Sequence, residues 1–145
     1  MKIFFDTSVL IAGMIEVHPL HEKSFSWLKR AKAKEFVWGI CSHTLVELYA
    51  TLTAMPLRPR ITTEIAVNLI HENIEGQARI VTLTGSDYKE VINKISKLNF
   101  SGGIIYDALI AHAAEKFRAD HLLTHNQQDF SRLFPRKDSF LIFPK

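Results

Sequence analysis

Carboxylate side chains mark the places where this sequence could carry out chemistry. The first is Asp6, which follows the apolar run Ile3-Phe4-Phe5 and precedes a helical pattern that begins near Ser8. A non-alternating apolar run suits a strand buried on both faces of a parallel sheet, and such sheets bind ligands beyond the carboxyl ends of their strands. Asp6 is therefore a candidate site residue, although Asp and Ser are also preferred as helix N-caps.

Asp107 is the most informative acid in the chain. It lies in the run from Ile104 to Ala114, where apolar residues occupy nearly every side of the expected helix. Such a helix is expected to be buried, and a buried carboxylate is costly unless a cation or hydrogen-bond donors offset its charge. The alternative is a first-turn aspartate that only complements the helix dipole.

Two further polar groups have both an ordinary and a functional interpretation. Glu47 follows Thr44 in the order S/T-x-x-E, which fits a helix capping box as well as a functional acid. The segment 124–129 follows another apolar run. It is either a turn whose Asn or Asp caps a short helix or a second polar group at the end of a strand.

These side chains can converge in one crevice. Asp6 and the 124–129 turn are expected at the carboxyl ends of parallel strands, and Glu47 and Asp107 in the first turns of helices that begin at the same edge. Crowded carboxylates raise one another's pKa unless a divalent cation lies among them. Oxygen ligands without sulfur suit Mg²⁺ or Mn²⁺, and such an ion can activate water for attack on a phosphodiester.

The elements that must position these acids alternate between strands and helices. We expect strands at 3–5, 36–41, 79–83, 120–124 and 140–143, and helices at 8–16, 20–34, 42–54, 62–73, 86–98, 104–117 and 128–133, with Ser86 capping the fifth helix. This order predicts an α/β fold with a largely parallel sheet. The chain of 145 residues is expected to form a single domain, 1–145.

Composition narrows the class of protein. Hydrophobic residues make up 47% of the chain and charged residues 23%, which is ordinary globular composition. No apolar run approaches the ~20 residues of a membrane span, and the amino terminus lacks a signal-peptide pattern. The single cysteine, Cys41, lies in an apolar run and is expected to be a buried thiol in a reducing cytoplasm. The net charge of +3 permits contact with a polyanion but does not require it.

The ordered set of motifs resembles the PIN-domain ribonucleases, and among them the VapC-type toxins of prokaryotic toxin–antitoxin pairs. The likeness covers essentially the whole chain and rests on Asp6-Thr7-Ser8, Thr44-Leu45-Val46-Glu47-Leu48, Tyr106-Asp107-Ala108-Leu109-Ile110-Ala111 and the segment 123–130. It implies a PIN-like three-layer α/β/α sandwich with a central parallel sheet of about five strands. It also implies a Mg²⁺- or Mn²⁺-dependent endoribonuclease, a homodimer, and a small antitoxin that covers the acidic cleft.

The resemblance also implies roles for individual residues. By position, Asp6, Glu47 and Asp107 match the three core acids, with Asp6 and Asp107 as direct metal ligands. The fourth acidic position holds Asn126, and the next acid, three residues later, is Asp129. A neutral amide adds no charge, so the number of metal ions stays open. The polar positions that orient these acids or a ligand are Thr7, Ser8 and Thr124.

Other classes of protein fit the residues less well. A receiver-type signalling domain requires a phosphorylatable Asp after the third strand, where this chain has Leu83-Thr84-Gly85-Ser86. A histidine-based metal hydrolase could use His43 and Glu47, spaced i, i+4, but the chain has no HExxH motif. We interpret the other histidines considered as solvated or core-edge residues: His18, His21, His112 and His121. A third alternative keeps the fold without the chemistry, as a binding module, because Asn126 replaces an acid.

Overall fold

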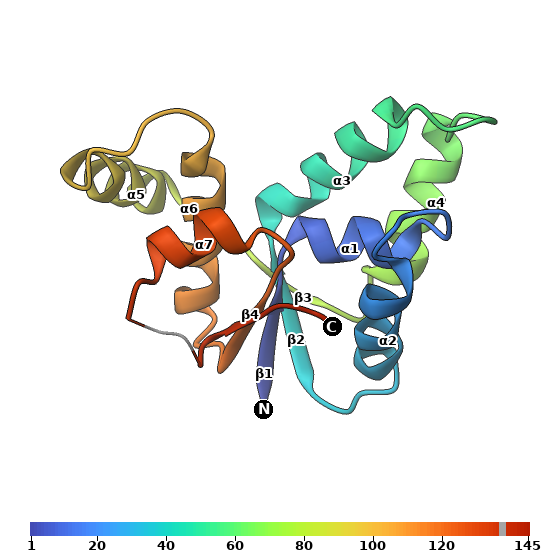
Figure 1. Ribbon diagram of the computed structural model, residues 1–145, viewed down its shortest axis with the longest axis horizontal. Coiled ribbons are helices and arrows are strands. Elements are labelled where there is room, and N and C mark those ends of the chain that lie inside the picture. Colours follow the sequence, from blue (N-terminus) through green and yellow to red (C-terminus); the bar gives the residue numbers. More distant parts are fainter. Residues whose placement is uncertain (137–138) are drawn as a thin grey trace.

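The computed structural model describes residues 1–136 and 139–145, and it has a five-stranded parallel sheet between two layers of helices (Figure 1). The strands are β1 (Lys2–Phe5), β2 (Val37–Cys41), β3 (Arg79–Val81), β4 (His121–Leu123) and β5 (Leu141–Ile142). The helices are α1 (Thr7–Met14), α2 (His21–Lys32), α3 (Ser42–Ala54), α4 (Thr63–Asn73), α5 (Gly85–Lys97), α6 (Ile104–Lys116) and α7 (Gln127–Leu133). The predicted three-layer α/β/α architecture is confirmed.

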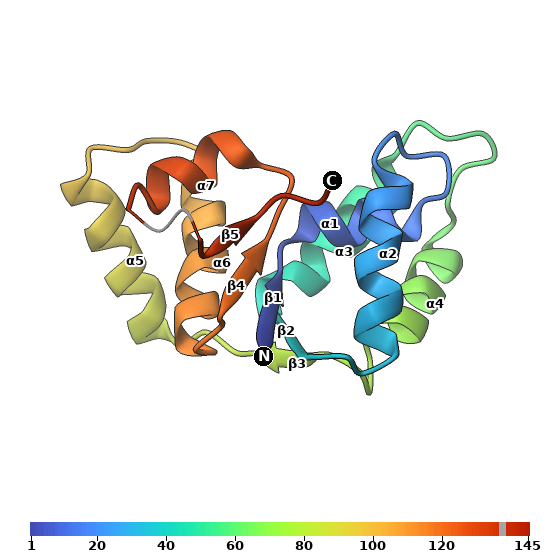
Figure 2. The ribbon, with the colours of Figure 1, turned by 60° about the horizontal axis from the view of Figure 1, so that its bottom comes forward.

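The order of the strands places a crevice at the centre of the sheet. The order is β3-β2-β1-β4-β5, so the chain first runs outward from β1 through β2 to β3 and then returns to the other side of β1 (Figure 2). Phe4 pairs with Leu122 and Phe5 with Leu123 across β1 and β4. Ligands of open α/β sheets bind where the strand order reverses, beyond the carboxyl ends of the strands. Asp6 follows β1 at this point.

Two hydrophobic cores lie on opposite faces of the sheet. Figure 1 shows α1–α4 on one side of the sheet and α5–α7 on the other. Successive side chains of a strand point to opposite faces, so Ile3 and Phe5 pack among α1–α4 and Phe4 packs among α5–α7. Phe5 contacts Trp38, with ring centroids 4.9 Å apart, and Phe4 contacts Phe117, with centroids 5.6 Å apart. The helices on the two sides of the carboxyl end of β1 therefore belong to different cores.

Local details confirm one expectation and correct another. Cys41 is buried, and burial raises the pKa of its thiol. The cap of α5 is Thr84 rather than Ser86, because Thr84 and Asp87 form a reciprocal capping box that starts the helix at Gly85.

None of the helices within the described residues combines the length and apolar character that a membrane crossing needs.

Gly39 in β2 should tolerate no larger side chain. A Cβ there would lie 3.0 Å from two ring atoms of Phe117 and 3.1 Å from the carbonyl oxygen of Arg79. We expect Gly39→Ala to lower the free energy of unfolding by about 1–3 kcal/mol, as overpacking typically does, when measured by urea denaturation. Gly85→Ala is the matched control, because a Cβ at Gly85 meets nothing within 4 Å. Equal stability of the two variants would contradict the prediction.

Candidate functional site

A cleft of about 400 Å³ lies beyond the carboxyl ends of β1 and β4. Its lining comes from the start of α1, the loop before α2, the helices α3 and α6, and the loop before α7. The structure brings six of the predicted site residues together in this lining: Asp6, Thr7, Ser8, Glu47, Asp107 and Asn126. The other two stand directly behind the lining, Thr124 against Asp6 and Asp129 against Asn126.

Asp6 is the most deeply placed acid, with only 4% of its surface exposed. Its backbone N–H donates to the carbonyl of Leu123 (2.9 Å), which extends the β1–β4 pairing by one residue. Its Oδ2 accepts hydrogen bonds from the hydroxyls of Ser8 (2.6 Å) and Thr124 (2.8 Å). Burial raises the pKa of Asp6, and these two hydroxyls partly offset the shift. Asp6 occupies the position before α1, but its side chain makes no capping hydrogen bond.

Glu47 is held by α1 rather than by its own helix. Its Oε1 accepts a hydrogen bond from Thr7 (3.3 Å), and Nε2 of His43 lies 3.8 Å away. The helix α3 begins at Ser42, and Thr44 is buried against Thr7 instead of capping it. The capping-box interpretation of Glu47 is therefore wrong. Burial raises the pKa of Glu47, the neighbouring His43 lowers it, and the charge of Asp6 raises it.

The pKa of Asp107 is raised to about 7. Burial is the largest cause, followed by the charge of Asp6, by Asp129 and by the charge of Glu47. Nδ2 of Asn126 donates to both Asp107 (3.3 Å) and Asp129 (3.2 Å). The helix-dipole alternative does not account for Asp107, because a solvated first-turn acid would keep an ordinary pKa.

Asn126 has two functions that an aspartate could not combine. Its Oδ1 accepts the backbone N–H of Asp129 (3.3 Å) and so caps α7, while its Nδ2 bridges the two carboxylates. A carboxylate has no donor when ionised, so an acid at this position would add repulsion where the amide adds two hydrogen bonds. Asn126 therefore orients Asp107.

The cleft suits a hard divalent cation that keeps part of its water shell. Within residues 1–136 and 139–145, ligand atoms of three His, Cys, Asp or Glu residues lie within 4.8 Å of one another only at Asp87, Glu90 and His112. The cleft carboxylates are thus more widely spaced. Mg²⁺ is usually bound by one or two carboxylates together with waters and substrate phosphates, and Asp6 and Asp107 are two carboxylates that line this cleft. A cation between Asp6 and Asp107 would offset the repulsion that raises the pKa of Asp107.

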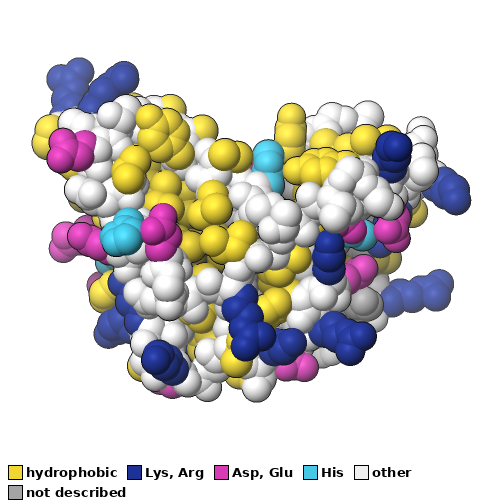
Figure 3. All heavy atoms as spheres, turned by 180° about the vertical axis from the view of Figure 1, so that it is seen from behind, with side chains coloured by type: hydrophobic (Ala, Val, Ile, Leu, Met, Phe, Trp, Pro, Cys, Tyr) yellow, Lys and Arg dark blue, Asp and Glu magenta, His cyan; other side chains and the backbone are white. Residues whose placement is uncertain are grey.

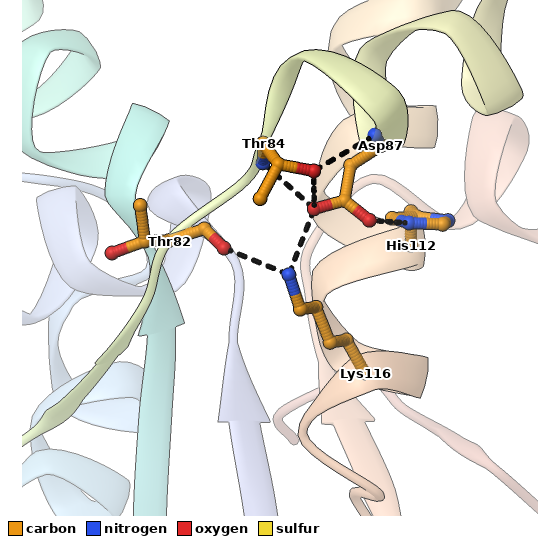
Figure 4. Close-up of polar contacts among 5 residues, drawn as sticks. All are labelled: Thr82, Thr84, Asp87, His112 and Lys116. Carbon is orange, nitrogen blue, oxygen red and sulfur yellow. Dashed lines mark hydrogen bonds and ion pairs between the residues drawn. The ribbon is translucent and has the colours of Figure 1, made fainter.

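The cluster around Asp87 is a structural clamp between α5 and α6 (Figure 4). Oδ2 of Asp87 accepts from the N–H (2.7 Å) and hydroxyl (3.0 Å) of Thr84 and from Nζ of Lys116 (2.8 Å). Its Oδ1 lies 2.9 Å from Nε2 of His112. These contacts hold the pKa of Asp87 far below its usual value, with the Lys116 bond the largest cause. The ammonium group of Lys116 already supplies a positive charge to Asp87.

Two histidines of the cleft were missed by the sequence interpretation. His18, assigned above to the solvated or core-edge group, lines the cleft, as does His125. Nε2 of His125 lies 2.6 Å from the hydroxyl of Ser24, which is fully buried in α2. Burial lowers the pKa of His125, as do the charges of His18 and Lys23. The position of His125 between Thr124 and Asn126 was the available signal, whereas nothing in the sequence placed the loop of His18 over the cleft.

Replacing Asp107 with Asn should stabilise the metal-free protein at alkaline pH. The folded-state pKa of about 7 lies above the ordinary value of 3.8, so ionisation of Asp107 costs stability as the pH rises between these values. For a half-buried, partly screened carboxylate we expect Asp107→Asn to gain about 1–2 kcal/mol at pH 8 and nothing below about pH 4. Urea denaturation in EDTA across this range measures the difference. The exposed Glu72→Gln is the control, and parallel stability curves for Asp107→Asn and wild type would refute the prediction.

Replacing Asp87 with Asn should lower the Tm at neutral pH. A depressed folded-state pKa gives stability that is present above the usual pKa of about 4 and is lost as the pH falls below it. The loss in Tm should therefore shrink between pH 7 and pH 3 in thermal denaturation. Glu90→Gln changes the next acid of α5 and should leave the Tm unchanged. A Tm that falls with Glu90→Gln or with EDTA would instead indicate a metal ion in the clamp.

Comparison with known proteins agrees with this architecture. The profile of the PIN domain family matches residues 3–133. A relative named Ribonuclease VapC27, from Mycobacterium tuberculosis, is 30% identical over 115 residues, which cover 79% of this chain and 78% of the relative. Ribonuclease VapC40 of the same species is 30% identical over 110 residues, which cover 76% of each chain.

Solved structures share the fold at lower identity. VapC20 of Mycobacterium tuberculosis, described as a sarcin-ricin loop cleaving toxin, superposes with a TM-score of 0.69 at 18% identity and covers 89% of this chain and 93% of its own. VapBC2 of Rickettsia felis, solved on a promoter DNA fragment, gives a TM-score of 0.64 at 19% identity, with both chains fully covered. The profile match spans most of the sequence, and the chain belongs to the PIN domain family.

Proposed function

We propose that this protein is a Mg²⁺- or Mn²⁺-dependent endoribonuclease, the toxin of a type II toxin–antitoxin pair, and that residues 1–145 act as a single domain in the cytoplasm. The observation that carries the proposal is that Asp6, Glu47 and Asp107 line one cleft, where burial raises the pKa of all three and neighbouring carboxylates add to the shift at Glu47 and Asp107. Perturbed carboxylates in a cleft are the signature of a site that works with a cation. The ribonuclease names of the VapC relatives support RNA as the substrate.

Each cleft residue has a role in this proposal. Asp6 and Asp107 hold the cation, since the two walls of the cleft present them to a common space. Ser8 and Thr124 fix the carboxylate of Asp6, and Asn126 fixes that of Asp107. When bound, the cation would lower the pKa of a water and offset charge on the phosphate oxygens. Asp129 supports Asn126 from behind the cleft.

We assign to Glu47 the role of receiving the proton of the attacking water. The hydroxyl of Thr7 donates to Oε1 of Glu47 and so orients the carboxylate. Burial raises the pKa of Glu47 towards neutral pH, as a general base requires. In the reaction the water oxygen attacks phosphorus, the bond from phosphorus to the 3′-oxygen breaks, and that oxygen takes up a proton. The products carry a 5′-phosphate and a 3′-hydroxyl.

Exposed apolar side chains support the proposal that this protein binds other proteins. The molecule is hollowed between an arm that carries α3 and α4 and an arm that carries α5, and hydrophobic side chains gather on both arms (Figure 3). Exposed apolar residues of α3, α4 and α5 include Val46, Tyr49, Ile65, Val67, Tyr88 and Ile92. Exposed apolar surface of this kind marks interaction sites. We assign it to a small antitoxin and to a second copy of the chain in a homodimer, in line with the VapBC complexes among the structural neighbours.

A binding module without activity is the second candidate, because Asn126 replaces a charged ligand. One experiment separates the nuclease from the binding module. Purified protein is incubated with total RNA in Mg²⁺, Mn²⁺ or EDTA, and the cut ends are mapped. We expect cleavage with either metal and none in EDTA, with the ends named above. RNA binding without cleavage under every condition would favour the binding module.

Single substitutions test the residue roles. Asp6→Asn, Glu47→Gln and Asp107→Asn should each reduce the cleavage rate by about 10²-fold or more, because each removes a charge or a proton acceptor from the reacting centre. Glu72→Gln, an exposed acid of α4 away from the cleft, should cleave at the wild-type rate. Cleavage at the wild-type rate by the Asp6 or Asp107 variant would overturn the assignment of the site.

A further inference from the structure

Two chemically different kinds of side chain line the cleft. Its carboxylates come from Asp6, Glu47 and Asp107, whereas the loop before α2 and the loop before α7 contribute the imidazoles of His18 and His125. An RNA strand brings a negatively charged phosphodiester at every nucleotide. The carboxylates require a cation before they accept a phosphate, but a nitrogen donor can accept one directly.

The tautomer of His18 is fixed by its own loop. The backbone N–H of Leu20 donates to Nδ1 of His18 (3.0 Å). A ring nitrogen that accepts a hydrogen bond carries no proton, so the proton of the neutral ring is on Nε2. Within the described residues, Nε2 of His18 has no hydrogen-bond partner. His18 therefore lines the cleft with a ring whose Nε2–H donor has no partner among the described residues.

His125 is tied to the same wall and to the acids. Its Nε2 meets the buried hydroxyl of Ser24 in α2 (2.6 Å), and its backbone N–H donates to the hydroxyl of Ser8 (3.1 Å), which in turn donates to Asp6. This chain of hydrogen bonds sets the position of His125 relative to Asp6. A cleft of about 400 Å³ has room for a nucleotide that contacts both kinds of side chain.

We propose that His18 and His125 form a subsite for the phosphodiester next to the one that is cleaved, with Nε2 of His18 donating to a phosphate oxygen and His125 forming its wall. This inference rests on the proposed ribonuclease function and adds a second point at which the RNA backbone contacts the cleft. His18 is a binding residue in this scheme, and it takes no part in the proton transfers of the reaction.

The test compares two replacements of His18 that preserve different parts of its chemistry. His18→Asn keeps an acceptor for the N–H of Leu20, as Asn does in an Asx-turn, but is too short to present a donor at the position of Nε2. His18→Gln restores an N–H donor near that position. His71→Asn, an exposed histidine of α4 that pairs with Glu75, is the control.

Binding is measured as the Kd for a labelled oligouridylate, in the Asp107→Asn protein with Mg²⁺, so that cleavage does not consume the probe. His18→Asn should weaken binding about tenfold or more, the usual loss for a hydrogen bond to a charged group, while His18→Gln and His71→Asn stay near the parent value. The effect should persist with oligodeoxyuridylate, because the phosphate rather than the 2′-hydroxyl is recognised. An effect confined to the ribose form, or equal Kd values for all variants, would overturn the proposal.

A spectroscopic measurement separates binding from a structural role. In the protein with isotope-labelled histidine, the nitrogen chemical shifts should report Nε2–H for His18, and adding oligouridylate should shift Nε2 of His18 while leaving His71 unchanged. A Nε2 signal that ignores RNA would contradict the subsite. Cleavage by wild-type protein with unaltered binding by His18→Asn would leave the nuclease assignment standing and remove only this inference.

Discussion

The burial of several carboxylates in one cleft, with repulsion added at Glu47 and Asp107, is the constraint on which the site depends. Asp6, Glu47 and Asp107 each resist ionisation, and the fold tolerates them because hydroxyl and amide donors take up part of their charge. The donors come from different elements: Ser8 from α1, Thr124 from the end of β4, Thr7 from α1 and Asn126 from the cap of α7. The folded chain thus stores an unfavourable charge arrangement that a cation would relieve.

The fold could be predicted because its signals are local. Apolar runs marked the strands, and prolines, glycines and polar caps marked the ends of helices, so each predicted element is present with ends shifted by at most two residues. The capping residue of α5 was predicted wrongly, because two residues compete for this position. Both Thr84 and Ser86 are suitable residues, and only the reciprocal bond with Asp87 decides between them.

The candidate site was predictable only where residues follow a strand or open a helix at the same edge of the sheet. Asp6, Asp107 and Asn126 satisfy that rule, and the structure places them in one cleft. Glu47 needed Thr7 as a partner to distinguish it from a capping residue. His18 lay beyond sequence reasoning, because its position depends on how α2 packs against the segment that follows β4, through the contact of Ser24 with His125. The metal ion itself and the roles of these residues remain predictions.

The two hydrophobic cores on opposite faces of the sheet have a consequence for the geometry of the cleft. Glu47 and Thr7 lie on helices that pack in one core, whereas Asp107 lies on a helix that packs in the other. The sheet separates the two cores. The distance between the opposing acids is therefore fixed by the packing of both cores and not by the cleft residues alone.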